Sequence, residues 1–301
     1  MHLVCLGVVR KLIILWQNKG PKTVRLPSWK IRKITNSLLT LKTFVTNDFP
    51  RKPRAIEDVA RWKATEFRQF LLYTGPVVLK NILSSDCYEN FMALSISMRI
   101  LLSPNYKQYV EYARKLLVYF VKSFEQIYGS QFMSYNFHSL IHLPDDYIRF
   151  GPLDCCSAIP FENYMKDLKN MLRKNEKPLQ QVVRRYEEKC KSGNIEHNSD
   201  IKKVKFTTKE PNCYFSTQSG EIVKITEIVS PMTSNNKIFI GKIFLNQEEM
   251  FVSPVKSSKL NIYNVNNLSQ NVYKWDFSDI KMKMMIFHFE GLVTAIPIIH
   301  S

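Results

Sequence analysis

The sequence contains no uninterrupted apolar run that approaches the roughly 20 residues a helix needs to cross a bilayer. Its most apolar stretch, residues 3–16, is interrupted by Arg10 and Lys11, and no small-residue cleavage site follows it. A secretory signal peptide would need both an intact apolar segment and such a site. This stretch therefore predicts a buried helix, and we expect no membrane partner.

The cysteines lack the regular spacing of a disulfide framework. Six are present, and no two of them form a Cys-x-x-Cys motif. Without a secretory signature, this pattern predicts free thiols in a reducing compartment.

Acidic residues are almost absent from the first 54 positions. Twelve lysines and arginines stand there against one acid, Asp48, which is a surplus of eleven in a formal net charge of +17 for 301 residues. A protein this basic attracts polyanions and binds them in a salt-dependent way. The phosphate contacts predicted from the densest clusters are Lys22, Arg25, Lys30, Arg32, Lys33, Arg51, Lys52 and Arg54.

Trp29 and Trp62 lie among these basic residues, and we expect both indoles to be available for stacking on bases. For any single lysine or arginine, a solvated helix face is the simpler explanation. Taken as an ensemble, the basic residues favour DNA as the partner.

Residues 138–169 bring together several groups that could carry chemistry. His138 and His142 are four residues apart, which places both imidazoles on one face of a helical turn, where they could hold a metal. A loop is predicted to follow, with Asp145 and Asp146 as turn and capping residues.

A helix is then predicted to start after Pro160, so Glu162 falls in its first turn. A carboxylate there is favoured by the helix dipole, which lowers its tendency to hold a proton and leaves it ready to bind a cation. An ordinary first-turn glutamate, worth roughly 0.3–1 kcal/mol to the helix, is the alternative.

This segment resembles the C-terminal catalytic portion of CACTA (En/Spm-type) DNA transposases, which carry the pattern H-x-x-x-H-L-P, G-P and P-F-E-x-Y-M-x-x-L-K. In that family the glutamate after Pro-Phe is the last member of an Asp-Asp-Glu triad in a ribonuclease-H-like domain. The resemblance implies that Glu162 is catalytic and binds Mg²⁺, in a two-metal site for DNA cleavage and strand transfer.

Residues 1–16 are similar to the family segment that follows the second catalytic aspartate in the pattern D-x-x-H. His2 matches the histidine of that pattern, so the aspartate would fall two positions before Met1. The first aspartate and a Cys-x-x-Cys are expected further upstream. The resemblance therefore implies the back half of a transposase, inactive alone because both aspartates are missing.

Residues 49–83 resemble the helical region that animal members of the family insert between the second aspartate and the glutamate. Together the three stretches extend the resemblance over most of residues 1–190, with a weaker likeness beyond. It implies DNA as partner, the nucleus as location, Mg²⁺ in an intact enzyme and a homo-oligomer of unspecified size.

The resemblance also suggests that His138 and His142 complete a zinc site with the upstream Cys-x-x-Cys, because Zn²⁺ takes two thiolates and two imidazoles. Only half of that ligand set is present in this sequence. Ordinary histidines of the core are the alternative, and the residues leave both readings open.

The periodicity predicts an α+β fold. Helical spacing predicts helices at 31–45, 56–70, 76–83, 88–102, 106–128 and 179–191, and strand-like segments are predicted at 213–217, 221–229, 237–245, 249–254 and 284–288. We expect a basic helical region at 1–130, the end of a ribonuclease-H-like domain at 131–190, a polar linker at 191–205 and a small antiparallel barrel or sandwich at 206–301.

Two functions remain open from the sequence. One is a fragment of an Asp-Asp-Glu transposase that contributes Glu162 to strand transfer. The other is a transposon-derived protein without enzymatic activity, which binds DNA or another protein.

Overall fold

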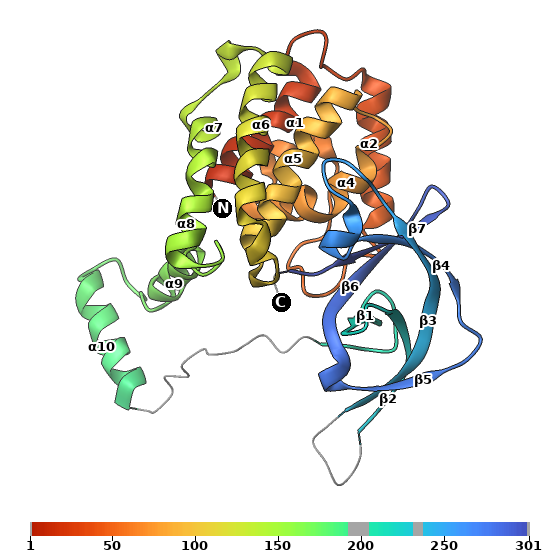
Figure 1. Cartoon of the computed structure of the whole chain (residues 1–301). Helices are drawn as coiled ribbons and strands as arrows, with labels where there is room; N and C mark the ends of the chain where they lie inside the picture. Colours follow the sequence, from red (N-terminus) through yellow and green to blue (C-terminus); the bar gives the residue numbers. More distant parts are fainter. Residues whose placement is uncertain (1, 192–204, 231–236, 300–301) are drawn as a thin grey trace. The chain divides into compact units, whose positions relative to one another are not determined.

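The computed structural model describes residues 2–191, 205–230 and 237–299, except the side chains at positions 159, 160, 162, 163 and 166. The chain forms two compact units, one made of Met1–Leu153 with Val204–Ser301, the other of Asp154–Lys203. The first unit joins a helical part to an antiparallel sheet, and the second contains two helices (Figure 1). The predicted α+β class, mostly helical at first and β-rich at the end, is confirmed.

Residues 42–63 form a long connection with a 3-10 turn at Ile56–Arg61, and shorter connections join the other helices of the first unit. The helix bounds are α1 Arg10–Ile14, α2 Ser28–Leu41, α3 Ala64–Gln69, α4 Gly75–Val78, α5 Ser85–Leu102, α6 Val110–Tyr128, α7 Tyr135–Ser139 and α8 Leu143–Phe150.

The apolar N-terminus forms the buried helix that its sequence predicts. Wider, π-type turns at His2–Val9 and Leu15–Lys19 flank α1 and continue it in both directions. Trp16 is fully buried, and its Nε1 donates a hydrogen bond to the Tyr128 hydroxyl at 2.8 Å. Among the described helices, none is both long and apolar enough to span a membrane.

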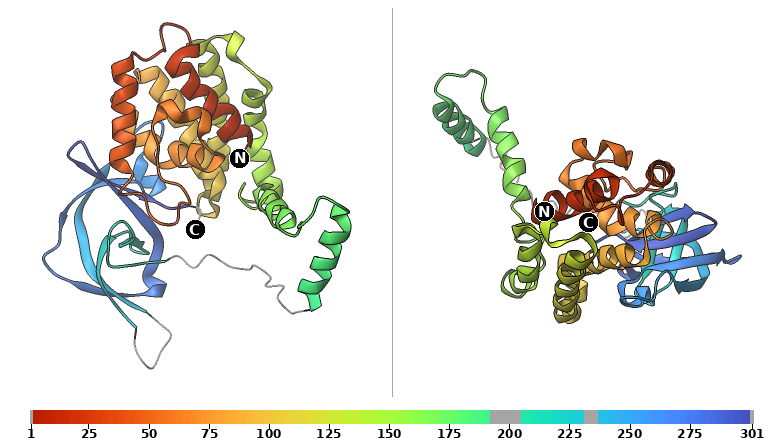
Figure 2. Two further views of the ribbon diagram at one scale, coloured as in Figure 1. Left: turned by 180° about the vertical axis from the view of Figure 1, so that it is seen from behind. Right: turned by 90° about the horizontal axis from the view of Figure 1, so that it is seen from above.

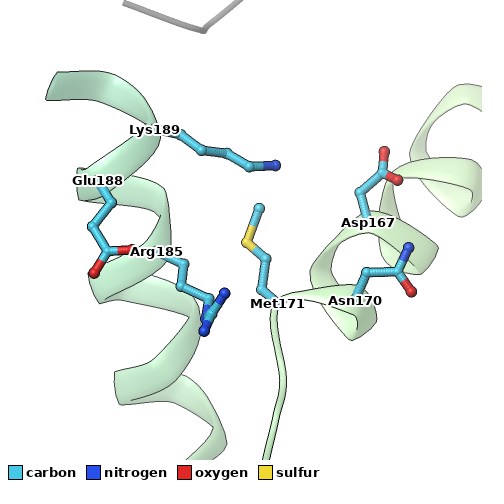
Figure 3. Close-up of a pocket in the computed structure, with 6 residues that line it drawn as sticks. All are labelled: Asp167, Asn170, Met171, Arg185, Glu188 and Lys189. Carbon is cyan, nitrogen blue, oxygen red and sulfur yellow. The ribbon is translucent and has the colours of Figure 1, made fainter. Parts of the chain in front are cut away.

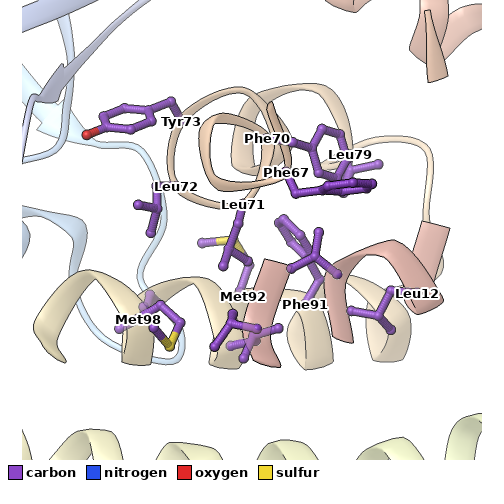
Figure 4. Packing of buried hydrophobic residues seen from close by; sticks show 14 of the residues in the cluster. Leu12, Phe67, Phe70, Leu71, Leu72, Tyr73, Leu79, Phe91, Met92 and Met98 are labelled. Carbon is purple, nitrogen blue, oxygen red and sulfur yellow. The ribbon is translucent and has the colours of Figure 1, made fainter. Parts of the chain in front are cut away.

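Aromatic side chains fill the helical core (Figure 4). Phe70 meets Phe91 edge to face with ring centroids 5.9 Å apart, and Trp62 packs against Phe67 and Phe70 at 5.4 and 5.7 Å. Burial of one such side chain stabilises the fold by about 1.5–3 kcal/mol. The stretch 49–83 therefore supplies much of this core.

The loop predicted after His142 is wrong at its start, because α8 forms there. Pro144 stands at the beginning of the helix, where a missing N–H costs nothing, and Asp145 and Asp146 lie in the first turn, where the dipole favours them. Gly151 ends α8 with a φ of +80°, a conformation that glycine adopts without strain. The two aspartates are thus helical residues.

The second unit contains α9 Ile159–Asn170 and α10 Pro178–Lys191. Both agree with the predicted helices, and Pro160 lies within the first turn of α9. Gln181 of α10 fastens the connection between them, because its side chain accepts from the Arg173 N–H at 3.0 Å and donates to the Lys174 carbonyl at 2.9 Å. The predicted polar linker falls almost entirely outside the described residues.

The sheet is antiparallel and closes on itself. The strands are β1 Tyr214–Thr217, β2 Ile222–Val229, β3 Ile238–Glu249, β4 Tyr263–Leu268, β5 Tyr273–Asp276, β6 Ile280–Phe289 and β7 Leu292–Pro297. Their order is β2-β1-β6-β7-β4-β3-β5, and a further β2–β3 pairing joins the two sides. The long β3 makes this closure, since it pairs with β2 along one edge and with β4 and β5 along the other.

The sheet contains three strands that the sequence does not predict, and it lacks one that the sequence does predict. The predicted strand at 249–254 is wrong, because β3 ends at Glu249 and residues 250–254 form no strand. β4, β5 and β7 were not predicted. β4 contains three asparagines, which strands disfavour, and its pairing with β3 overrides that preference.

One of two hydrophobic clusters runs from the helices into the sheet, and the other lies within the sheet itself. Met285, Phe287 and Ile296 of the sheet are buried in the same cluster as the helical core residues. The fully buried Arg99 of α5 donates to the Pro297 carbonyl at 3.0 Å and to the Leu72 carbonyl at 2.5 Å. The β-rich tail, expected to be a domain of its own, is therefore packed into the same compact unit as the helices.

A buried ion pair ties the sheet to the loop after α2. Lys283 of β6 is 1% exposed at its side chain, and its Nζ lies 2.8 Å from Asp48 Oδ2. Burial acts to raise the pKa of Asp48, but the contact with Lys283 and its positive charge outweigh burial and hold this pKa below its usual value. Ionised Asp48 therefore stabilises the fold above pH 4, and this contribution is lost as the pH falls through its folded-state pKa.

We expect Asp48→Asn to lower the free energy of unfolding by roughly 3 kcal/mol at pH 7, because it leaves a buried ammonium without its counter-charge. The difference from the unaltered protein should shrink as the pH falls below about 4. Urea unfolding followed by circular dichroism across this pH range measures both effects. Glu125→Gln, at an exposed position of α6, is the control, and a difference independent of pH would contradict the assignment.

Candidate nucleic-acid interface

Half of the eight predicted phosphate contacts serve the fold. Lys30 donates to the Ile82 carbonyl at 2.7 Å, and Lys52 donates to the carbonyls of Val45 and Thr46. Lys33 lies 3.3 Å from Glu290. These three ammonium groups hold neighbouring loops in place.

Arg54 is the fourth of these structural cations. Its guanidinium donates to both carboxylate oxygens of the buried Glu66, at 2.6 and 2.8 Å, and to the Arg61 carbonyl at 2.8 Å. The hydrogen bond to Glu66 raises the pKa of Arg54. A two-pronged contact of this kind occupies the donors that a phosphate would need.

Trp62 is not available for stacking, contrary to the prediction. It is only 6% exposed, and its Nε1 donates to the Ala55 carbonyl at 3.1 Å. Its ring packs against Phe67 of α3 and against Phe70, which follows that helix. Trp29, by contrast, is 60% exposed on α2, with Lys30 Nζ 5.7 Å from its ring centre.

The other four predicted contacts, Lys22, Arg25, Arg32 and Arg51, point to solvent. Lys19, outside the prediction, is exposed beside the first two. Within the part of the chain that the structure describes, none of these five forms an ion pair. Their charges are therefore available to a polyanion.

The connector from Lys19 to Ser28 is held in one conformation that displays three of these cations. The Leu26 N–H donates to the Trp16 carbonyl at 2.8 Å, and the Arg25 N–H donates to the Pro21 carbonyl at 3.0 Å. Gly20 is required at the first bend, because a Cβ there would lie 2.6 Å from the Leu15 carbonyl oxygen. A fixed connector places its charges without the entropy loss of ordering a loop.

Helix α2 continues this surface at the outer side of the helical part (Figures 1 and 2). Ile34, Leu38 and Leu41 are buried on one side of it, while Arg32 and Asn36 are exposed on the other. No acidic residue occurs between Ser28 and Leu41. We call the exposed residues Lys19, Lys22, Arg25, Trp29, Arg32 and Asn36 the basic face.

A groove of about 370 Å³ runs beside the basic face. It is lined by Gln17, Asn18, Leu26, Ser28, Ile31, Arg32 and Glu57. Glu57 is its acidic member, and it accepts a hydrogen bond from the Thr35 hydroxyl. The amide, hydroxyl and guanidinium donors of the remaining lining suit a phosphate or sugar oxygen.

The histidine pair lies on the other side of the helical part. His138 is the second-last residue of α7, and His142 ends the 3-10 turn that precedes α8. Both side chains are exposed, and their ring centroids are 5.3 Å apart. Two imidazoles bound to one Zn²⁺ by bonds of about 2.0–2.1 Å have ring centres roughly 5 Å apart. The spacing fits a shared ion, and the exposure argues against ordinary core histidines.

The segment that begins at His2 packs directly against α7. Gly7 makes this approach possible, because a Cβ there would lie 2.6 Å from Asn136 Nδ2. The structure thus brings two stretches that carry the transposase resemblance side by side, although more than 120 residues separate them. Asp145 is paired with Arg114, which donates a hydrogen bond to it at 2.8 Å and lowers its pKa. We therefore assign Asp145 no metal.

Glu162 occupies the first turn of α9, as predicted, and its side chain lies outside the described residues. Among the residues that are described, no group of three or more histidines, cysteines, aspartates or glutamates is placed to hold a metal ion. A cavity of about 430 Å³ lies between α9 and α10 (Figure 3). Its lining mixes both signs of charge, from Asp167, Asn170, Met171, Arg185, Glu188 and Lys189.

Comparison with known families matches residues 173–298 to a domain of unknown function (DUF8592). The match covers α10 and the whole sheet, and it leaves the basic face, the histidine pair and Glu162 outside. No curated protein and no solved structure matches the chain.

We expect the histidine pair to bind one Zn²⁺ per chain weakly, and the double change His138→Ala with His142→Ala to abolish this binding. Isothermal titration with Zn²⁺ measures it. His288→Ala, at an exposed histidine of β6, is the control. Unchanged zinc binding by the double variant would refute the assignment of the zinc site to His138 and His142.

Proposed function

We propose that this chain is part of an Asp-Asp-Glu DNA transposase and that it binds duplex DNA through the basic face. One observation carries the DNA part. Exposed cations, which form no ion pair among the described residues, lie on a fixed connector and on a helix that contains no acidic residue. Such a surface neutralises phosphates and releases their counterions, which drives binding to any duplex.

The transposase part rests on the sequence resemblance and on one structural observation that supports it. The stretch that begins at His2 and the stretch that contains His138 pack together in one compact unit. In an intact enzyme, two divalent ions would activate the attacking oxygen and stabilise the leaving one. Glu162 would contribute one of the carboxylates that hold them.

As it stands, the polypeptide should bind DNA without cutting it. One carboxylate cannot hold two cations in register, so cleavage needs the two aspartates of the family pattern beside Glu162. The alternative is a transposon-derived protein that never cuts and uses the basic face for DNA, or another surface for a protein partner. DNA as ligand agrees with a nuclear location, and transposase chemistry commonly requires an oligomer.

We expect the double change Lys22→Ala with Arg25→Ala to weaken binding to a random-sequence duplex. The slope of log K against log salt concentration should become less steep by roughly 2, since each neutralised phosphate contributes about 0.9. Fluorescence anisotropy over a salt series gives this slope.

The matched control removes the same charge elsewhere on the surface. Lys115→Ala with Lys122→Ala alters two exposed lysines of α6 and should leave the slope unchanged. Equal losses in both variants would show that net charge alone, rather than the basic face, binds DNA. No binding of the unaltered chain at low salt would refute the proposal outright.

The Glu162 assignment has its own test. In a protein supplied with both aspartates, Glu162→Gln should abolish strand cleavage and leave duplex binding nearly unchanged, because the amide cannot replace the charge that holds the metal. Cleavage is followed on a labelled duplex with Mg²⁺, and Glu176→Gln, in the connection after α9, is the control. Cleavage preserved in the Glu162 variant would remove this residue from the triad.

A further inference from the structure

The exposed face of α2 has a chemistry that phosphate binding alone does not need. Arg32 and Asn36 lie one turn apart, opposite the buried Ile34 and Leu38. A helix that only attracted phosphates would carry lysines or arginines at both positions. Here the face presents one exposed guanidinium and one exposed carboxamide, with the exposed Trp29 and Leu39 beside them.

Arg32 and Asn36 are the side chains that match base edges in the major groove. Arginine donates two hydrogen bonds to O6 and N7 of guanine, and asparagine pairs in the same two-pronged way with N6 and N7 of adenine. Four helical residues rise about 6 Å, and base pairs are stacked about 3.4 Å apart. The two side chains would therefore reach bases about two steps apart.

The surroundings of α2 allow it to enter a groove. The helix spans fourteen residues, about 21 Å in length, and lies at the outer edge of the helical part in both views of Figure 2. Exposed cations stand at both ends, with Lys22 and Arg25 before the helix and Lys42 after it. Phosphates on either side of a groove would meet these charges.

The acidic neighbours of this face lie at its flanks. Glu290, in the turn between β6 and β7, is neutralised by Lys33, 3.3 Å away. Glu57 is engaged by the Thr35 hydroxyl on the side of the groove. Glu57 also lines the groove that contains Arg32.

We infer that α2 is a recognition helix that lies in the DNA major groove, with Arg32 and Asn36 reading a guanine and an adenine about two base pairs apart. This inference rests on the proposed DNA binding and adds sequence preference to it. Lys22, Arg25 and Lys42 position the helix on the backbone, and they carry no sequence information themselves.

The test selects bound duplexes from a randomised pool with the full chain and sequences them. The unaltered protein should enrich guanine and adenine at this spacing. Asn36→Ala should lose the adenine preference, and Arg32→Ala should lose the guanine preference. Each change should weaken binding to the selected duplex by about 5- to 150-fold and binding to a random duplex by less, because only the selected duplex offers the guanine and the adenine.

Thr43→Ala, at an exposed position just beyond α2, is the matched control and should keep both preferences. Lys22→Ala should weaken binding to selected and random duplexes alike. No enrichment by the unaltered chain, together with a loss of random-duplex binding in the Lys22 variant, would overturn the recognition helix and leave the proposed function standing. Random-duplex binding that is indifferent to Lys22, Arg25 and Lys42 would overturn both.

Discussion

The fully buried guanidinium of Arg99 constrains how the two halves of the main unit meet. A charge taken out of water needs hydrogen-bond acceptors, and Arg99 finds them in the carbonyls of Leu72 and Pro297. Its Cζ lies 5.2 Å from the Tyr73 ring centre. Burial lowers the pKa of Arg99 from its ordinary value. These carbonyls belong to the helical core and to the end of β7, so the cation is satisfied only when sheet and helices are joined.

A second buried cation repeats this arrangement on the neighbouring strand β6, next to the residue that pairs with Pro297. Lys283 meets Asp48, and it also donates to the Lys205 carbonyl at 2.6 Å and to Asn212 Oδ1 at 3.2 Å. Asn212 in turn accepts from the Asn47 N–H at 3.1 Å. The loop after α2 is thereby fixed to the sheet, and α2 is held at the periphery with one face buried and the other exposed.

The basic N-terminal region divides into two populations once the fold is known. Lys30, Lys52 and Arg54 satisfy buried carbonyls or a buried carboxylate, whereas Lys22, Arg25 and Arg32 meet only solvent. In sequence the two populations look alike, because a lysine bound to a carbonyl 52 residues away has no local signature. Charge density therefore identifies the region, and only contacts identify the residues.

Much of the fold follows from local patterns. The 3.6-residue spacing of apolar residues predicts α2, α5 and α6, and Pro160 predicts the start of α9 to within two residues. Where local signals are weak, prediction fails: α8 replaces a predicted loop, and β4, with its three asparagines, depends on pairing with β3. No local pattern predicts that the Asn36 amide is exposed, because this depends on which side of α2 the rest of the fold leaves uncovered.

The sequence by itself determined the α+β class, the buried N-terminal helix, the excess of positive charge before Asp48 and the place of Glu162 in the first turn of a helix. All of these depend on residues close together in the chain. The tertiary structure decided that the sheet shares the helical core, that Trp62 is buried, that His2 begins a segment packed on α7 and that Arg32 and Asn36 share an open helix face. These features arise from contacts between distant segments, whose energies depend on packing and desolvation rather than on local spacing.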